Sequence, residues 1–211
     1  QLNESNLSAS IELESIYRDG QQWEKLIELL LQRVEFISDK LQKVETLHGV
    51  ARTFEQQLGQ PEQAFVVLQA AFREDYSNDV VSKELERLAS ACSKWSELLT
   101  EYTQVVQTIP DKQTAANLWE KIGRWYGDEL KHLDYAIASE KQALALVPTH
   151  IGALAALADF YRQTHQWADL SQVLGQHAGL DEEPEKKVEL FLALAEVWES
   201  QLMDAERAIA A

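Results

Sequence analysis

Five histidines and one cysteine are the side chains of this 211-residue sequence best suited to nucleophilic, acid–base or metal chemistry. The histidines show neither H-E-x-x-H spacing nor any Cys/His ligand spacing; they are His48, His132, His150, His165 and His177. Cys92 lies in a helical pattern among apolar neighbours, and the sequence has no G-x-S-x-G, glycine-rich phosphate loop or calcium loop. We therefore expect no catalytic residue, no metal site and no cofactor.

Carboxylates are the most abundant reactive groups, with 35 Asp and Glu against 19 Lys and Arg and a formal net charge of −16. Two carboxylates across a groove could act as general acid and base, but no spacing singles out such a pair. The acidic runs at 128–129 and 181–183 are interpreted as solvated helix ends. Because a field of this sign repels phosphate backbones and anionic lipid, nucleic acid and membrane surfaces are poor partners.

The cellular location is weakly constrained by the sequence. No apolar run approaches the roughly 20 residues that span a bilayer, so we expect no membrane insertion. The single cysteine excludes an internal disulfide framework but not an oxidising compartment, and a cytoplasmic location is favoured. The chain begins with Gln1 rather than Met and stops at "DAERAIAA" within a helical pattern. We therefore expect an excerpt of a longer protein.

The elements that must position these charges are predicted to be helices. Only eight glycines and four prolines punctuate long segments of Leu, Ala, Glu, Gln and Lys at helical spacing. Pro61 and Pro184 fall just before helices, where a missing N–H costs nothing, while Pro110 and Pro148 follow helices that they could not continue. The sequence therefore predicts an all-α chain.

An internal repeat with a period of about 72 residues, the size of two helical hairpins, organises the whole chain without a gap. Trp23, Trp95 and Trp167 are separated by this period, each at the expected start of a second helix, where we expect it to pack over the first. Four more triplets are identical at the same interval: Leu13, Leu85 and Leu157; Leu26, Leu98 and Leu170; Leu58, Leu130 and Leu202; Ala64, Ala136 and Ala208. Each copy has room for four helices.

Residues 119–148 carry a recognisable motif, formed by Trp119, Ile122, Gly123, Tyr126, Ala136 and Pro148. This motif resembles the tetratricopeptide repeat, W-x2-L-G-x2-Y…A-x3-F…P. Glu140 stands where that family has an aromatic residue, and one extra residue separates Tyr126 from Ala136. Segments 47–68 and 191–208 fit the same frame, whereas Glu14 and Glu86 replace the small glycine in units one and three, which are expected to pack differently.

The resemblance implies a right-handed α-solenoid, a superhelix of about six stacked antiparallel helix pairs. We expect a single repeat domain over residues 1–211, with units near 7–40, 41–78, 79–112, 113–150, 151–184 and an incomplete one at 185–211. No polar capping helix is visible at either end. The exposed repeat ends are therefore predicted to self-associate, and the last unit to be the least protected.

A row of basic residues is the candidate partner-binding site. Tetratricopeptide-like proteins use the inner surface, which is lined by first helices, and the residue after the small position is Arg52, Arg87 and Arg124 in units two to four. Lys83 and Lys121 lie one turn earlier on the same face, and Arg162 projects from the following unit. The alternative is that these side chains only pair internally with Glu45, Glu55, Glu84 and Glu120.

The favoured function is a non-catalytic protein–protein interaction scaffold that holds an acidic or extended partner segment in the groove. Long arrays of this style also resemble those of large bacterial assemblies for polarity, motility or envelope construction. Two alternatives stay open: an enzyme or small-ligand protein on a helical solenoid, with a compact pocket and shared carboxylates, and a passive spacer with no functional groove.

Overall fold

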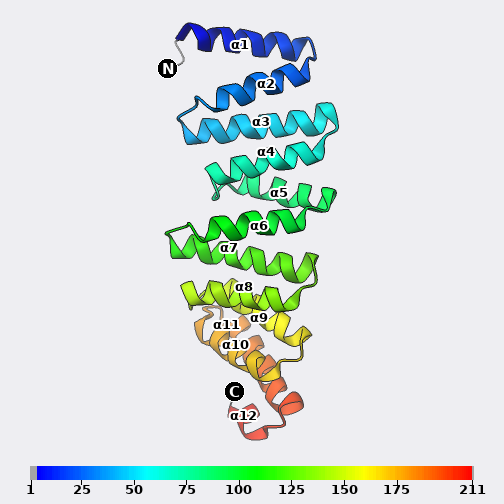
Figure 1. Cartoon of the computed structure of the whole chain (residues 1–211). Helices are drawn as coiled ribbons and strands as arrows, with labels where there is room; N and C mark the ends of the chain where they lie inside the picture. The colour runs from blue at the N-terminus through cyan, green and yellow to red at the C-terminus, as the bar shows by residue number, and fades with distance from the viewer. Residues whose placement is uncertain (1–3, 211) are drawn as a thin grey trace. The chain divides into compact units, whose positions relative to one another are not determined.

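A computed structural model describes the backbone of residues 4–210 and the side chains from residue 9 onward. Within this range the chain forms twelve α-helices and no strand, in the order shown in Figure 1. The predicted all-α solenoid class of helix pairs is confirmed. The chain divides into two compact units, Gln1–Glu101 and Tyr102–Ala211. The single domain predicted over 1–211 stays a prediction, and residues 1–3 and 211 lie outside the described part.

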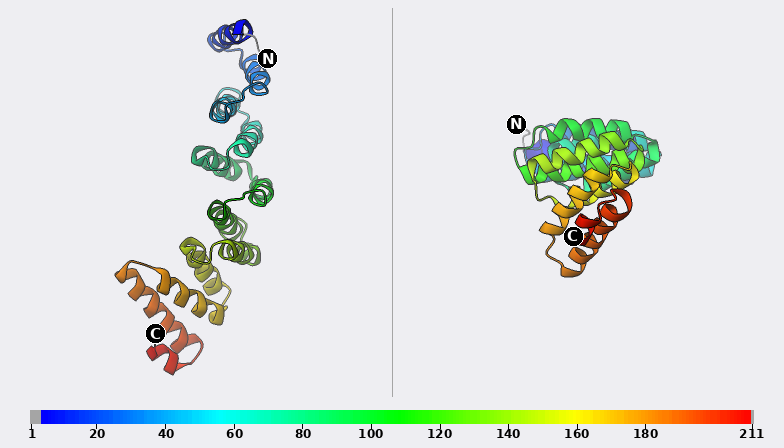
Figure 2. Two further views of the ribbon diagram at one scale, coloured as in Figure 1. Left: turned by 90° about the vertical axis from the view of Figure 1, so that its left-hand side faces the viewer. Right: turned by 90° about the horizontal axis from the view of Figure 1, so that it is seen from below.

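In the first unit the first five helices each pack against the next in the sequence, and Figures 1 and 2 show the successive helices of this row. Short connections force an antiparallel arrangement, because the chain must reverse within a few residues. The helices are α1 (Glu4–Asp19), α2 (Trp23–Val34), α3 (Lys40–Leu58), α4 (Pro61–Glu74), α5 (Asp79–Cys92) and the first part of α6 (Trp95–Val106).

The second unit continues the same pattern from the end of α6, and again each helix from α7 onward packs against its successor. Two of its first helices end in a wider π-helical turn. The elements are α7 (Lys112–Arg124) with η1 (Trp125–Glu129), α8 (Leu133–Leu146), α9 (Ile151–Gln163), α10 (Trp167–Leu180), α11 (Pro184–Glu196) with η2 (Val197–Gln201), and α12 (Ala205–Ala210).

The first helices α3, α5, α7 and α9 of their helix pairs each begin with a capping side chain, and these caps repeat with the 72-residue period of the sequence. Asp39 and Asp111, one full period apart, accept hydrogen bonds from the backbone N–H groups of Gln42 and Thr114 and so cap α3 and α7. Asn78 caps α5 through two backbone N–H groups, and His150 caps α9 by accepting 3.1 Å from Ala153 N–H through Nδ1. Side chains thus satisfy amide groups that the first turn of a helix leaves unpaired.

The ends of the first helices repeat in the same way. Every residue with positive φ in the described range belongs to one of two triplets spaced by the sequence period: Gln21, Ser93 and His165, and Gly59, Lys131 and Met203. The residue after each of them donates its N–H to a carbonyl five or six residues earlier, as Lys94 does to Ala89 at 2.7 Å. These left-handed caps stop each first helix and turn the chain toward the second.

The π-helical turns account for the extra residue between Tyr126 and Ala136. In η1 the Leu130 N–H donates to the Trp125 carbonyl, five residues earlier, at 3.2 Å, and Leu202 donates to Val197 in η2 at 3.1 Å. One residue is therefore absorbed within the helix, and the aromatic side chain before it keeps its place in the repeat.

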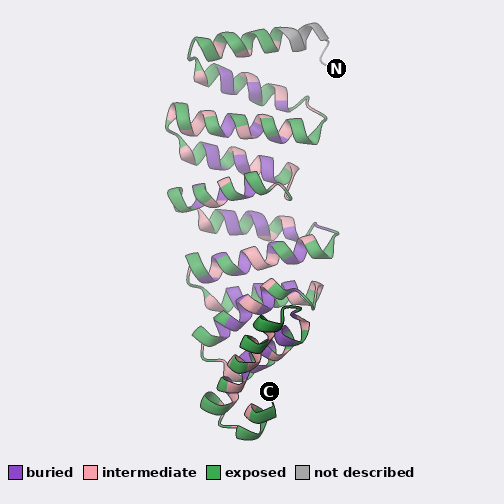
Figure 3. Cartoon of the chain, turned by 180° about the vertical axis from the view of Figure 1, so that it is seen from behind, coloured by how far each residue is buried: buried purple, intermediate pink, exposed green. Residues whose placement is uncertain are grey.

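The core of each unit is a stripe of apolar side chains along the facing sides of the helices (Figure 3). Repeat-equivalent Leu85 and Leu157 are 0% and 1% exposed, whereas Leu13, in the first helix of the chain, is 38% exposed. Trp23 and Trp167 are half-buried against the cores at the first positions of α2 and α10, as predicted. No helix in the described range is long and apolar enough to cross a membrane.

Candidate partner-binding grooves

The first candidate site is a groove of about 500 Å³ between α3 and α5 in the first unit. We call it the arginine groove; it is lined by His48, Arg52, Glu55, Gln56, Val80, Glu84 and Arg87. Both helices place these side chains on one face, because the lining residues recur every three or four positions. The structure therefore brings together Arg52 and Arg87 from the predicted row, whereas Lys83 does not line the groove.

Arg87 is held by two carboxylates inside the arginine groove. Its Nη1 and Nη2 donate to the two carboxylate oxygens of Glu55 at 2.8 and 2.6 Å, and its Nε and Nη2 donate to Glu84 at 3.1 and 2.8 Å. The hydrogen bonds to Glu55 and then to Glu84 raise the pKa of Arg87 above its ordinary value. The paired arrangement fixes the guanidinium plane and links α5 to α3.

Arg52 differs from Arg87 because it is exposed and has no ion pair among the described residues. Burial, followed by the neighbouring Arg52 charge, lowers the pKa of His48 below 6.5. The His48 ring is therefore neutral at pH 7, with one donor and one acceptor nitrogen. Arg52 is therefore the charged side chain of this groove that has no ion pair among the described residues.

The remaining residues of the row lie in the second unit or outside the groove. Lys83 is exposed on α5, and Lys121 lies on α7. Arg124 Nε pairs with Glu120 at 3.0 Å, and Arg162 pairs with Asp159 at 3.1 Å. These contacts and those of Arg87 are ion pairs within the chain, as the alternative interpretation of the basic row predicts.

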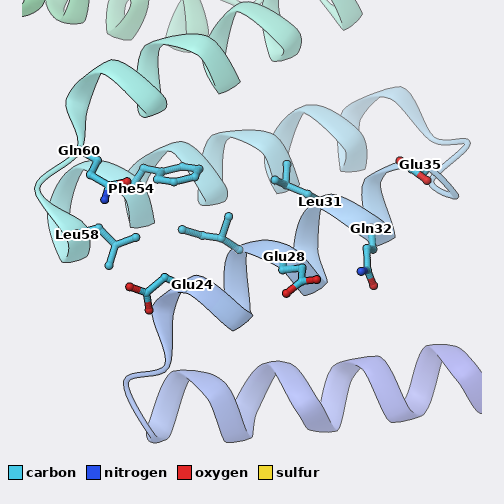
Figure 4. A pocket seen from close by; sticks show the side chains of 9 residues that line it. Glu24, Glu28, Leu31, Gln32, Glu35, Phe54, Leu58 and Gln60 are labelled. Carbon is cyan, nitrogen blue, oxygen red and sulfur yellow. The ribbon is translucent and has the colours of Figure 1, made fainter.

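A second groove, which the sequence interpretation missed, runs along α2 and encloses about 380 Å³. We call it the α2 groove; Figure 4 shows its side chains projecting from α2 and from the end of α3. Its apolar floor is formed by Ile27, Leu31, Phe54 and Leu58, and its polar rim by Glu24, Glu28, Gln32, Glu35 and Gln60. Ile27 is buried and Leu31 is 37% exposed, so the floor joins the core to the surface.

A buried carboxyl group is the most unusual feature of the second unit. Glu140 on α8 is 0% exposed, and neither of its carboxyl oxygens has a hydrogen-bond partner among the residues that the structure describes. Burial first, and then the charge of Glu120, raise its pKa from 4.5 to about 9. The group is therefore protonated at neutral pH. It lies against Gly123, where a Cβ atom would come within 2.3 Å of its Oε1.

A buried histidine and aspartate lie where α10 meets α11. His177 is 4% exposed and Asp181 6% exposed, and His177 Nε2 lies 3.5 Å from Asp181 Oδ2. Burial lowers the pKa of His177, although the Asp181 carboxylate opposes this shift. Lys186 approaches the same carboxylate at 3.4 Å. In the described range no three His, Cys, Asp or Glu side chains gather as a metal-ion site.

The sequence held signals for some of these features. Glu140 stands out because it replaces an aromatic residue of the repeat motif, yet its burial depends on space left by Gly123 in another helix. The α2 groove has a signal in the repeat itself, since Glu24, Glu28 and Glu35 have uncharged equivalents in the next copy. Comparing the copies for differences, as well as for matches, would have singled out these three carboxylates.

The chain is similar to known proteins in one segment of its sequence and in its fold. Residues 153–188 match the family model of the tetratricopeptide repeat. No curated protein gives a significant sequence match. Among solved structures, PilF of Pseudomonas aeruginosa has 16% identity and a TM-score of 0.50, with 96% of this chain and 89% of that chain covered. A tetratricopeptide repeat protein of Parabacteroides merdae has 15% identity and a TM-score of 0.47, with 96% and 76% covered.

The repeat geometry and the matched segment agree with each other. The matched residues span α9, α10 and the start of α11, which is one helix pair with the beginning of the next. The likeness to PilF supports the same fold. Residues 153–188 are therefore similar to a tetratricopeptide repeat, and the rest of the chain is built from helix pairs in a gapless double repeat of the same kind.

Proposed function

We propose that this chain is a non-catalytic scaffold that holds an acidic segment of a protein partner in the arginine groove. Tetratricopeptide repeats serve in general as protein–protein interaction scaffolds, which gives the broad class. The observation that carries the finer proposal is the unpaired, exposed Arg52 beside Arg87, whose guanidinium is already oriented by two glutamates. A partner carboxylate would find one free guanidinium and one that Glu55 and Glu84 hold in place.

The other residues of the row would add contacts within their own units. Lys83 lies one helical turn before Arg87 in the first unit, and we propose that Lys121, Arg124 and Arg162 offer cationic contacts to an acidic segment in the second. Arg124 and Arg162 would first have to exchange their ion pairs with Glu120 and Asp159. Because exposed pairs of this kind contribute only about 0.2–1 kcal/mol, that exchange costs little.

A solenoid enzyme is the less supported alternative. Such an enzyme would need a pair of carboxylates that face each other in an accessible pocket. Glu140 is close enough to Glu120 for its pKa to rise, but Glu140 is fully buried. A substrate could not reach it without unpacking α7 from α8. The passive spacer is favoured by the internal ion pairs of Arg87, Arg124 and Arg162 and is the outcome to exclude by experiment.

The test uses synthetic peptides that carry aspartates two or three residues apart, with an asparagine peptide as the uncharged control. Binding is titrated at two salt concentrations. We expect Arg52→Ala to weaken binding of the acidic peptide about tenfold, since a charge-assisted hydrogen bond contributes about 1.5–3 kcal/mol when partly desolvated. The triple variant at Arg52, Arg87 and Arg124 should lose more, with unchanged helicity.

Lys112→Ala is the matched control, because Lys112 is an exposed cation outside the groove. Equal loss in this variant would show that the acidic peptide responds only to net charge. Undiminished affinity in the triple variant would favour the spacer. We also propose that the scaffold belongs to a large bacterial assembly for polarity, motility or envelope construction. A partner recovered from the source cell by the wild type but not by Arg52→Ala would support this.

A further inference from the structure

The α2 groove combines an apolar floor with carboxylates that lack cationic partners. Elsewhere in the first unit, glutamates join helices through ion pairs: Glu14 with Arg33, Glu74 with Lys43, Glu101 with Arg73, and Glu55 with Arg87. Glu24, Glu28 and Glu35 are exposed and form no ion pair within the described part of the chain. Their charges are therefore available to a molecule that enters the groove.

The repeat provides an internal comparison for these residues. At the positions of Glu24, Glu28 and Glu35 the second copy has Ser96, Thr100 and Gln107, and the third copy has Ala168, Gln172 and Gly179. Leu31, on the floor, corresponds to Thr103 and Gly175. The helix–helix packing that the three copies share does not require a carboxylate or a large apolar side chain at these positions.

The repulsion between Glu24 and Glu28 and the position of Glu35 also act against the local stability of α2. Glu24 and Glu28 are four residues apart, so they repel each other across one helical turn. Glu35 is the C-cap residue, where the negative end of the helix dipole disfavours a carboxylate. Only Glu24, in the first turn, has a favourable position. Residues that weaken their own helix and are absent from its copies need another reason to be there.

We propose that the α2 groove is a docking site for a basic amphipathic segment of a partner protein. Apolar side chains of that segment would cover Leu31 and the exposed parts of Phe54 and Leu58, and its Lys or Arg residues would face the three glutamates. Charge complementarity selects this occupant, because every charged residue that lines the groove is acidic. The site is separate from the arginine groove and takes a ligand of opposite charge.

The spacing of the rim sets the length of the segment. Glu24 and Glu35 are eleven positions apart, which corresponds to about 16 Å along α2. A helix of about three turns, or about five extended residues, spans this distance. Leu31 lies between Glu28 and Glu35 in sequence, so an apolar anchor should be flanked by basic residues on both sides.

The experiment uses a synthetic Leu/Lys peptide of about 18 residues with its leucines on one helical face. A Leu/Glu peptide with the same apolar face and a Ser/Lys peptide without one are the comparison probes. Affinity is measured by fluorescence anisotropy on the intact chain. We expect binding of the Leu/Lys peptide only, weakened about tenfold when Glu24, Glu28 and Glu35 are changed together to Gln. Leu31→Thr, the residue of the second copy, should weaken binding about fivefold.

The matched control changes Glu182, Glu185 and Glu189 to Gln. These exposed carboxylates lie in the second unit, and their removal changes the net charge by the same amount. The control should leave the affinity unchanged. Equal weakening in the control, equal binding of the Leu/Glu or Ser/Lys peptide, or no binding of the Leu/Lys peptide to the wild type would each overturn the proposal.

Hydrogen exchange locates the bound peptide. Amide groups of residues 24–35 and 54–60 should exchange more slowly in the complex. Protection around Arg52 and Arg87 instead would refute an α2 site. The Arg52→Ala variant should bind the Leu/Lys peptide as the wild type does, so failure of the acidic-segment proposal and failure of this one give different results.

Discussion

The two units have the same apolar framework but place their polar groups differently. In the first unit, carboxylates pair with exposed cations from other helices, as Glu55 does with Arg87 and Glu101 with Arg73. In the second unit, Glu140, His177 and Asp181 are removed from solvent. One repeat pattern therefore accommodates both ion pairs with exposed cations and buried titratable groups. Stability of the first unit should respond mainly to the loss of ion pairs, and that of the second to pH.

Truncation of a buried leucine in each unit should have the largest effect on stability and tests whether the two apolar cores are equivalent. Leu85→Ala and Leu157→Ala should each lower the free energy of unfolding of their unit by about 2–5 kcal/mol, because both side chains are fully buried. Leu13→Ala, at the same repeat position but 38% exposed, should cost about 1 kcal/mol or less. Denaturant unfolding combined with hydrogen exchange measures each unit. Clearly unequal losses at Leu85 and Leu157 would mean that the cores also differ.

Glu140 should make the second unit less stable as the pH rises. Its pKa is about 9 in the folded chain against an ordinary 4.5, so between these values the folded state holds a proton that the unfolded state has lost. Stability is therefore fully present below about pH 4.5 and falls by at most about 1.4 kcal/mol per pH unit toward pH 9. Unfolding measured from pH 5 to 8.5 should show this slope.

Two variants isolate that slope. Glu140→Gln should abolish it, because a neutral amide replaces the protonated carboxyl, while Glu189→Gln, at an exposed position, should preserve it. Persistence of the slope in Glu140→Gln would assign the pH dependence to another group and weaken the contrast between the units.

The ion pairs of the first unit should show a smaller effect. Arg73 Nε donates to Glu101 Oε1 at 2.6 Å, and Glu101 is 5% exposed. Arg73→Met leaves that carboxylate buried without its partner, so we expect a loss of about 1–2 kcal/mol, discounted because Arg73 itself is exposed. Arg162→Met breaks an exposed pair within one helix and should cost no more than about 0.5 kcal/mol. Thermal unfolding of both variants provides the comparison; equal costs would contradict it.

His177 should have the smallest of these effects and the opposite pH sign. Burial lowers its pKa in the folded chain, so the unfolded state takes up a proton first as the pH falls below 6.5. Asp181 and Lys186 face the same site, and the pKa of Asp181 lies below its ordinary 3.8, outside this window. We therefore expect a small loss of stability as the pH falls from 7 to 5.5.

The His177 measurement is made with Glu140→Gln, which removes the opposing slope in the same pH range. Adding His177→Gln should then flatten the acid limb, and His165→Gln, at an exposed histidine, should leave it in place. An acid limb that survives the loss of His177 would show that a different group binds the proton.

Periodicity predicted the helices well because their apolar stripes and caps depend on residues close in sequence. The repeat interval also located the starts of α2, α6 and α10 at Trp23, Trp95 and Trp167. Helical spacing named Glu55, Glu84 and Glu120 among the possible partners of the arginines, but it did not decide which pairs would form. Whether Arg87 meets Glu55 depends on the distance between α3 and α5, while Arg52, on α3 itself, stays unpaired among the described residues.

Burial of Glu140 illustrates the other limit of prediction from sequence. A glutamate on a helix is normally placed in solvent, and the cost of burying it has no local signature. The deciding feature is the missing Cβ of Gly123 on α7, which leaves room for the carboxyl group. Similarly, the α2 groove needs the end of α3 beside α2, and this contact appears only when the chain is folded.

The left-handed caps at the helix ends keep this chain below the stability that its fold could reach. Of the six cap positions only Gly59 is glycine; the others are Gln21, Ser93, Lys131, His165 and Met203. Non-glycine residues are strained in this conformation, and glycine relieves the strain while losing more entropy on folding. Because the strain of about 1–2 kcal/mol exceeds the entropic cost of about 0.5–1 kcal/mol, each replacement by glycine should raise the free energy of unfolding by about 0.5 kcal/mol. Evolution or engineering could therefore raise the stability of the repeat by substitutions at its turns, without changing the residues that line the grooves.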